Sequence, residues 1–141
     1  MDELPSRSSS DSSELLVKTK LFDIDNNIAS ALSYVPLVGA NIIFSIVWLV
    51  TEPKSNRYLR HHAIQSLVLN VGFVGIHIVL TLLAFTLGVI PFLGFLGIIP
   101  ALLGLVVSLV YFAGNVYLMY CAYKGRPLTI PYVTAIADQN T

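Results

Sequence analysis

Residues 61–123 read HHAIQSLVLNVGFVGIHIVLTLLAFTLGVIPFLGFLGIIPALLGLVVSLVYFAGNVYLMYCAY, and these 63 residues contain no Asp, Glu, Lys or Arg. A charge-free run of this length is too long for the interior of a small soluble domain. About 20 apolar residues are enough for a helix to cross the hydrocarbon layer of a bilayer. Glycine and proline interrupt the run at residues 88–100. We therefore predict two membrane-spanning helices, at about 63–87 and 101–120, joined by an apolar connector at 88–100.

A third apolar run precedes this stretch. Residues 28–50 carry no charge and follow Asp25 and Asn26, which are residue types that favour the start of a helix. As a helix they would be about 34 Å long, with a kink at Pro36 and Gly39. The predicted fold class is therefore an all-α integral membrane protein with three transmembrane helices, at about 28–50, 63–87 and 101–120.

The rest of the chain divides around this apolar part. Of the 141 residues, 55% are apolar and 11% charged, which indicates a single membrane domain at residues 28–123. Residues 1–27 are acidic and serine-rich, so we predict a disordered tail, in which 14–22 are compatible with a short interfacial helix. Residues 124–141 are predicted to be a short polar C-terminal tail. A single cysteine, Cys121, excludes an intrachain disulfide.

The distribution of Lys and Arg predicts an orientation. With three spans, loop 51–60 and the C-terminal tail lie on one side of the membrane and the N-terminal tail on the other. The first side has five bases and the second has three. We therefore expect a multi-pass protein of a bacterial plasma membrane or an organelle inner membrane. Its loop 51–60 and C-terminus would face the cytoplasm, and its N-terminal tail would lie outside.

Polar side chains form a stripe on each of the two later helices, when residues are placed at 100° intervals. The members are Ser66, Asn70, His77 and Thr81 on the second helix and Gly104, Ser108 and Asn115 on the third. In an antiparallel pair, Asn70 and Asn115 should lie at one depth and His77 near the level of Ser108. Two interpretations stay open. The stripes are interhelical packing and hydrogen-bonding surfaces, or they line a pathway for protons, ions or a polypeptide.

The boundary between loop 51–60 and the next helix is a second candidate contact region. Its bases suit contact with lipid headgroups or docking of a soluble partner, and the sequence does not separate these interpretations. The candidate residues are Lys54, Arg57, Arg60, His61, His62 and Gln65.

No residue pattern indicates catalysis or metal binding. The side chains of His61 and His62 would point about 100° apart on a helix, so they cannot both face one ion together with His77. No acid near them completes a ligand set. The sequence contains no nucleophile with a base and an orienting acid, no phosphate-binding glycine loop and no intramembrane acid pair. We therefore predict no catalytic, cofactor-binding or metal-binding residues, no enzymatic activity and no nucleic-acid partner.

Three segments resemble a known family. RYLRHHAIQSL at 57–67, ALSYVPL at 31–37 and GRPLTIPYVTAIADQ at 125–139 are similar, in order, to motifs of the twenty-kilodalton Tic translocon subunits of the chloroplast inner envelope. They are also similar to those of small bacterial relatives of unknown function. His61 stands where that family usually has Phe, and the plant proteins have four spans, so the bacterial relatives are the better match. For the plant subunit, the resemblance implies a part in protein import; it brings no catalytic residues.

Two functional hypotheses follow. The first is a non-enzymatic structural or interaction component of a membrane, which assists protein translocation or membrane-protein assembly. Its partners would be the lipid bilayer and either further copies of the chain or another membrane protein. The alternative is a small homo-oligomeric pore or transporter lined by the polar stripe of the second helix.

Overall fold

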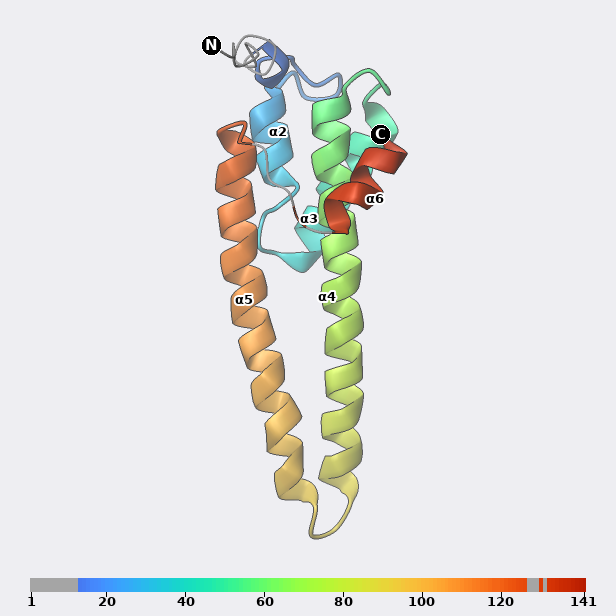
Figure 1. Ribbon diagram of the computed structural model, residues 1–141, viewed down its shortest axis with the longest axis vertical. Coiled ribbons are helices and arrows are strands. Elements are labelled where there is room, and N and C mark those ends of the chain that lie inside the picture. The colour runs from blue at the N-terminus through green and yellow to red at the C-terminus, as the bar shows by residue number, and fades with distance from the viewer. Residues whose placement is uncertain (1–12, 127–129, 131) are drawn as a thin grey trace, which may run out of the picture.

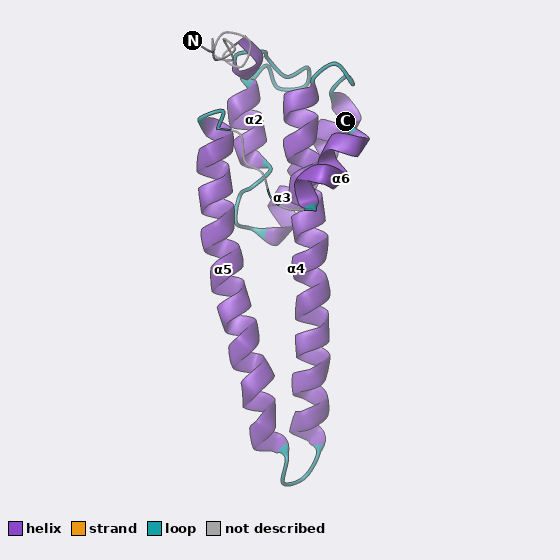
Figure 2. Ribbon diagram, in the orientation of Figure 1, coloured by secondary structure: helices purple, strands orange, loops and turns teal. Residues whose placement is uncertain are grey.

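The computed structural model describes residues 13–126, 130 and 132–141, and helices dominate this part of the chain (Figures 1 and 2). An isolated β-bridge between Lys18 and Asp25 is the only extended pairing among the described residues. The helical elements, in order, are α2 (Asn26–Leu32), α3 (Val38–Thr51), α4 (Arg57–Val89), the 3-10 turn η1 (Gly94–Gly97), α5 (Ile98–Tyr123) and α6 (Val133–Asn140).

Helices α4 and α5 form a long antiparallel hairpin (Figure 1). At 1.5 Å per residue they are about 50 and 39 Å long, and both are long and apolar enough to cross a membrane. Only 6% of the most apolar part of each is buried inside the protein, whereas the core helix of a soluble protein would be mostly buried. The predicted helices 63–87 and 101–120 lie within α4 and α5, which extend several residues further at both ends.

The connector between these helices is shorter than the predicted segment 88–100. Helix α4 continues to Val89, and α5 already begins at Ile98, with Pro100 in its first turn. Proline is tolerated there because the amide of a first-turn residue has no partner within the helix. The turn is tight: a Cβ on Gly97 would lie 3.0 Å from the carbonyl oxygen of Ala84. A side chain at this position would therefore press against the backbone of α4.

The prediction of one continuous helix over residues 28–50 is wrong. Helix α2 ends at Leu32, residues 33–37 reverse the chain, and α3 returns to the end from which α2 came (Figure 1). The break surrounds Pro36, which has no amide hydrogen and disfavours helical geometry at the preceding residue. The side chains of Asn26 and Asn56, at the two ends of this segment, exchange hydrogen bonds of 2.9 Å. Residues 28–50 are thus a helical hairpin whose ends lie together, not a third span.

The hairpin also brings the described residues before α2 to the same end of the molecule as loop 51–60, whereas the prediction placed the N-terminal tail and this loop on opposite sides. The backbone amide of Lys20 donates to the Glu52 carboxylate at 2.8 Å, and the Asn27 side chain donates to the carbonyl oxygen of Tyr123 at 3.4 Å. The chain before α2, loop 51–60 and the end of α5 therefore meet at one end of the molecule. Residues 1–12, part of the predicted disordered tail, lie outside the described residues.

The C-terminal segment contains a helix that the sequence did not lead us to expect. Helix α6 packs against α4 and buries Ala137 completely. His61 Nδ1 lies 3.0 Å from a carboxylate oxygen of Asp138, and Gln65 Nε2 donates to Thr134 Oγ1 at 3.4 Å. Part of the predicted polar tail is therefore a packed element of the polar end.

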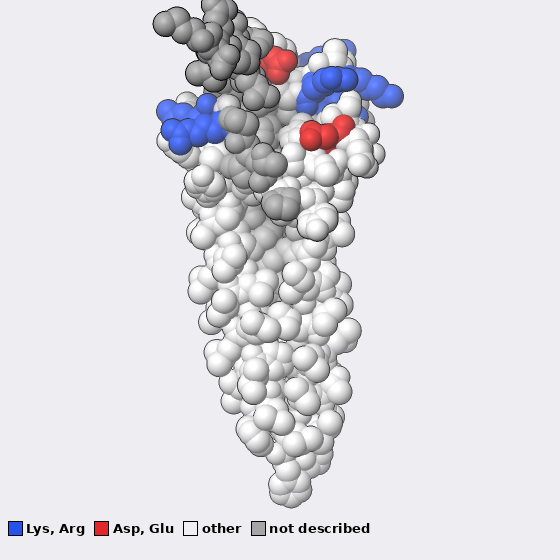
Figure 3. Space-filling model, viewed as in Figure 1, with Lys and Arg blue, Asp and Glu red and all other residues white. Residues whose placement is uncertain are grey.

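Among the described residues, the charged ones lie at that end, and Figure 3 shows blue and red side chains only there on the face in view. We call it the polar end; it comprises α2, α3, α6, the start of α4 and the end of α5. The opposite end, at residues 88–100, has no polar side chain, and the Phe92 ring is 96% exposed there. The described charged residues are Glu14, Lys18, Lys20, Asp23, Asp25, Glu52, Lys54, Arg57, Arg60, Lys124, Arg126 and Asp138.

Candidate functional site

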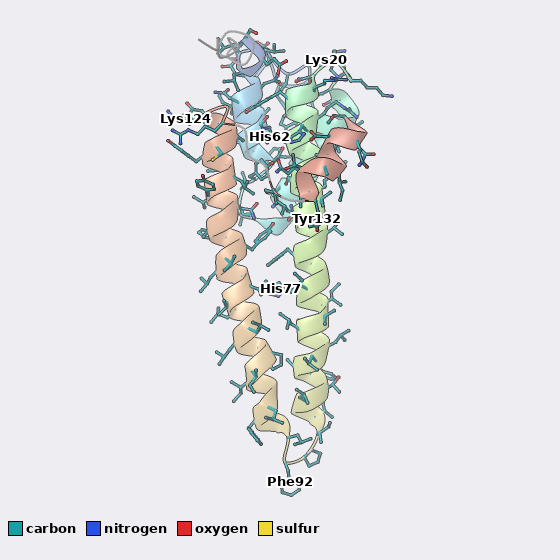
Figure 4. All side chains as sticks on the ribbon, in the orientation of Figure 1. Lys20, His62, His77, Phe92, Lys124 and Tyr132 are labelled. Atoms are coloured by element: carbon teal, nitrogen blue, oxygen red, sulfur yellow. The ribbon has the colours of Figure 1, made fainter. Side chains whose placement is uncertain are left out.

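The interior of the polar end is itself largely polar. Here the hairpin α2–α3 packs against α4 and α5, and most of the buried side chains carry hydrogen-bonding groups. A small apolar cluster forms the outer part of this packing: Trp48, Leu59, Ala29 and Ala63 are fully buried. The candidate site consists of three polar layers within this end, and a further polar pair lies deeper between α4 and α5. Figure 4 labels His62, which belongs to the second layer, and His77, which belongs to the deeper pair.

The outermost layer joins the two ends of the hairpin to the start of α4. In addition to its exchange with Asn26, the Asn56 side chain donates to Glu52 Oε2 at 3.0 Å. Arg60 Nη1 donates to the carbonyl oxygens of Leu49 and Glu52, at 2.8 and 3.2 Å. These are carbonyls at the C-terminus of α3 that have no partner within the helix. Arg60 therefore anchors α3 to α4.

A second layer links the turn of the hairpin to α4 and α6. The Tyr34 hydroxyl donates to Gln65 Oε1 at 2.9 Å, and it lies 3.1 Å from His62 Nδ1. Since a hydroxyl has one hydrogen, His62 must donate from Nδ1, which defines its tautomer. Burial raises the pKa of the Tyr34 phenol above its ordinary value, so this hydroxyl keeps its proton.

The third layer connects three helices at the bottom of the hairpin. Asn41 on α3 donates to the Tyr111 hydroxyl on α5 at 2.9 Å, and this hydroxyl donates to the Asn70 side-chain oxygen on α4. Ser66, one turn before Asn70, donates to the backbone oxygen of Ser33. Two side-chain hydrogen bonds and one bond to the backbone thus hold the hairpin to α4 and α5 in this layer.

The deeper pair lies in the part of the molecule that contains only α4 and α5. The Ser108 hydroxyl donates to the backbone oxygen of Gly104 at 2.9 Å, so its oxygen must accept from His77 Nε2, 3.1 Å away. His77 Nδ1 is then an acceptor, and no hydrogen bond to it or to the exposed Thr81 hydroxyl forms among the described residues. These groups line a groove of about 370 Å³ between the two helices.

The stripe residues therefore lie in three different settings. Ser66 and Asn70 are buried in the third layer, where Asn70 contacts Tyr111 and not Asn115. Asn115 is buried and donates within its own helix, to the carbonyl oxygen of Tyr111 at 2.9 Å. The remaining members, His77, Thr81, Gly104 and Ser108, line the groove.

The predicted contact region divides into exposed and buried residues. Lys54 and Arg57 are exposed, and the half-buried His61 faces Asp138. His62 and Gln65 are buried, so they are not available for contact with headgroups or a soluble partner. The prediction is wrong for these two residues because the hairpin and α6 cover this side of α4.

Two open pockets lie at the polar end. One, of about 390 Å³, includes Lys18, Lys20, Glu52 and Arg57, and the other, of about 410 Å³, includes Glu14, His61 and Asp138. Both mix acids and bases, so neither has the charge of a dedicated anion or cation site. Within the described ranges, no three His, Cys, Asp or Glu side chains come close enough to hold a metal ion.

Several site residues were not identified from the sequence, above all Tyr34, Asn41 and Glu52. A signal for Asn41 was present: with Ser45, four residues later, it forms a polar face on an apolar helix. Both are fully buried. The partners of Tyr34 and Glu52, in contrast, come from residues about 30 positions away, and no local pattern indicates them.

Comparison with known proteins places the chain in a family. The sequence model of the family described as "Magnetosome magnetite crystal formation protein family" (MamF/MmsF) matches residues 25–137. A UPF0132 membrane protein of Methanocaldococcus jannaschii is 35% identical over 122 residues, which cover 86% of this chain and 93% of the relative. A UPF0132 membrane protein of Archaeoglobus fulgidus is 34% identical over 114 residues, 81% of this chain and 93% of the relative. No solved structure matches.

These matches correct the resemblance drawn from the sequence. None of them is a Tic subunit, although they cover all of the middle segment 57–67 that suggested that family. The resemblance rested on three short motifs, whereas the family match extends over residues 25–137. The protein therefore belongs to the MamF/MmsF family of small membrane proteins.

Proposed function

We propose that the protein is a non-enzymatic structural component of a membrane, inserted as a helical hairpin from one side. Helices α4 and α5 cross the hydrocarbon layer, and the polar end works at the membrane surface. The observation that carries this proposal is the separation of charge from apolar surface: every described charged residue lies at one end, and the two long helices expose apolar side chains below it.

The lengths of the helices support this arrangement. From Ile98 to Tyr117, α5 rises about 30 Å, the thickness of the hydrocarbon layer. Tyr117, Tyr120 and Tyr123 follow at the polar end, and tyrosine is enriched at membrane interfaces. Phe92 and Phe95 occupy the far end. The third polar layer, at Tyr111, would then lie about 10 Å below the tyrosines.

The charge distribution supports a cytoplasmic polar end. With two spans, the seven described Lys and Arg residues all lie on one side, and the far turn has none. Cytoplasmic segments close to membrane helices are enriched in these residues. The described residues before α2, loop 51–60 and α6 would therefore face the cytoplasm.

Cysteine accessibility tests this topology. In a Cys121→Ala background, single cysteines at Lys20, Lys54 and Lys124 should all react with an impermeant maleimide from the same side of sealed membranes. A cysteine at Phe92 should not react from that side. Labelling of the Lys20 position from the side opposite to Lys54 would contradict the proposal, because it would require a third crossing.

Further copies of the same chain are the proposed partner. In a bilayer, the groove below the polar end exposes His77 Nδ1 and the Thr81 hydroxyl to hydrocarbon, where a polar group without a hydrogen bond is costly. Acyl chains offer no donor or acceptor, but the groove of a second copy does.

Disulfide crosslinking tests this pairing. In the Cys121→Ala background, Thr81→Cys should form a disulfide-linked dimer when membranes are oxidised. Val79→Cys is the matched control, because Val79 is two residues away and 63% exposed on another face of α4. Equal dimer yields at both positions would indicate random collision and would contradict a specific interface.

The pore hypothesis receives less support from the geometry. A pore between copies would need the polar stripe of α4 to face outward, but Ser66 and Asn70 are buried and bonded within the chain. Only the groove residues stay available, and they form one short polar patch.

The description of the matching family names crystal formation. If this chain takes part in such a process, the polar end would be the region involved, because the described charged side chains lie there.

A further inference from the structure

The molecule has unequal cross-sections at its two ends. Helices α2 and α3 lie beside α4 and α5 in the polar half, whereas the other half contains α4 and α5 alone, and the outline tapers to the turn at Phe92 (Figures 1 and 3). The effect of these unequal cross-sections on a bilayer depends on whether the hairpin α2–α3 lies in water or in lipid.

The side chains of the hairpin answer that question. Four polar side chains of the hairpin face inward and are fully buried, namely Ser30, Ser33, Asn41 and Ser45, beside the buried apolar Ala29 and Trp48. Its outward-facing side chains are apolar and exposed, namely Ile28, Leu37, Ile43, Ile46 and Val50. A helix at the surface of a soluble protein turns polar side chains toward the solvent, whereas this hairpin turns apolar ones outward. The outer surface of the hairpin is therefore suited to acyl chains.

The depth of the hairpin limits it to one leaflet. Its turn is tied to α4 through Ser66 and its first residues in α3 to α5 through Asn41 and Tyr111. By the placement proposed above, Tyr111 lies about 10 Å below the interfacial tyrosines, less than half of the hydrocarbon thickness of about 30 Å. The far leaflet receives only α4 and α5.

We propose that this chain is a membrane wedge, which favours bilayers that curve with the polar end on the convex face. A helix is about 10 Å wide, so two additional helices occupy about 160 Å² more in the near leaflet than in the far one. Expanding one leaflet relative to the other bends the bilayer toward the expanded side, and shallow helical insertions are sensitive to curvature for this reason. The far turn is small and apolar, so it adds no area to the far leaflet that would offset the larger area in the near leaflet.

The inference rests on the proposed hairpin topology, so the experiment separates the two. The full-length protein, with Cys121→Ala and Lys54→Cys, is reconstituted into small and large vesicles of phosphatidylcholine alone, which removes attraction between charges. Flotation measures insertion, and an impermeant maleimide measures the fraction of polar ends that face outward. We expect equal insertion, with a severalfold higher ratio of outward to inward polar ends in small vesicles.

A variant isolates the contribution of the hairpin. Ile43→Asp with Ile46→Asp places charge on its lipid-facing side, which should withdraw it from the leaflet while α4 and α5 keep the protein inserted. The dependence of orientation on vesicle size should then be lost. Ile43→Ala with Ile46→Ala keeps an apolar surface and should retain the dependence, and circular dichroism verifies the helix content of both variants.

Each outcome has a defined meaning. Insertion with the same orientation ratio in small and large vesicles overturns the wedge and leaves the hairpin topology standing. Failure to float with either kind of vesicle overturns the topology itself. If the doubly charged variant keeps its helix content and still orients by vesicle size, the hairpin is not the source of the effect and the inference is wrong.

Discussion

Truncation of Trp48 to alanine is expected to destabilise the fold by about 3–5 kcal/mol, the range for loss of a large buried aromatic side chain. Trp48 is fully buried. Its ring stacks on Phe44 with centroids 6.2 Å apart and meets the edge of Phe22 at 5.9 Å. It also packs against α2 and α4 through Ala29 and Leu59. Removal leaves a cavity at the point where the hairpin joins the rest of the molecule.

The free energy of unfolding is measured by reversible unfolding in detergent, with circular dichroism as the signal. Ile46→Ala is the matched control on the same helix, because Ile46 is 48% exposed and faces outward. Its truncation should cost much less, since no cavity forms inside the protein. Equal losses for the two variants would show that Trp48 does not hold the hairpin in place.

Introduction of arginine at Val79 is expected to impair membrane insertion strongly. Val79 is 63% exposed and lies ten residues from the end of α4. That places it about 15 Å from the far turn, near the centre of a bilayer about 30 Å thick. Arginine at the centre of a membrane helix costs about 2.5–3.5 kcal/mol on insertion scales. The wild-type chain pays no such cost.

The control for this variant carries the same substitution at another depth. Val50 is 79% exposed and lies next to the C-terminus of α3 at the polar end, so Val50→Arg can reach the interface with its charge. Synthesis in the presence of liposomes, followed by an alkaline wash, measures the inserted fraction. A loss confined to Val79→Arg supports insertion of α4. The same yield for both variants would mean that Val79 does not face hydrocarbon.

The two long helices were predictable because their signal is local. The run from 61 to 123 contains no charge, and its length allows only a pair of spans with a turn. Glycine and proline mark where the turn must lie, and Gly97 shows why: a Cβ there would lie 3.0 Å from the carbonyl oxygen of Ala84 on α4, a tight contact. The level of His77 relative to Ser108 follows from the same helical geometry.

The tertiary structure decided how the third apolar segment folds, and residues 28–50 show the physical reason. Hydropathy measures transfer into an apolar phase, so a straight span and a broken hairpin with the same residues have the same value. The difference lies in partners: Asn26 bonds to Asn56, Asn41 to Tyr111 and Ser66 to the backbone of Ser33. These contacts join residues that are 30 or more positions apart.

The sequence by itself therefore determined that this chain contains a charge-free pair of antiparallel helices with basic residues near one end. Only the tertiary structure decided that the third apolar segment turns back, because Ser66 on α4 bonds to the backbone of its turn and Tyr111 on α5 bonds to Asn41 at the start of α3. That turn brought the described residues before α2 to the same end as loop 51–60 and buried His62 and Gln65 beneath the hairpin and α6. It also made the molecule wider at its polar end than at its far turn.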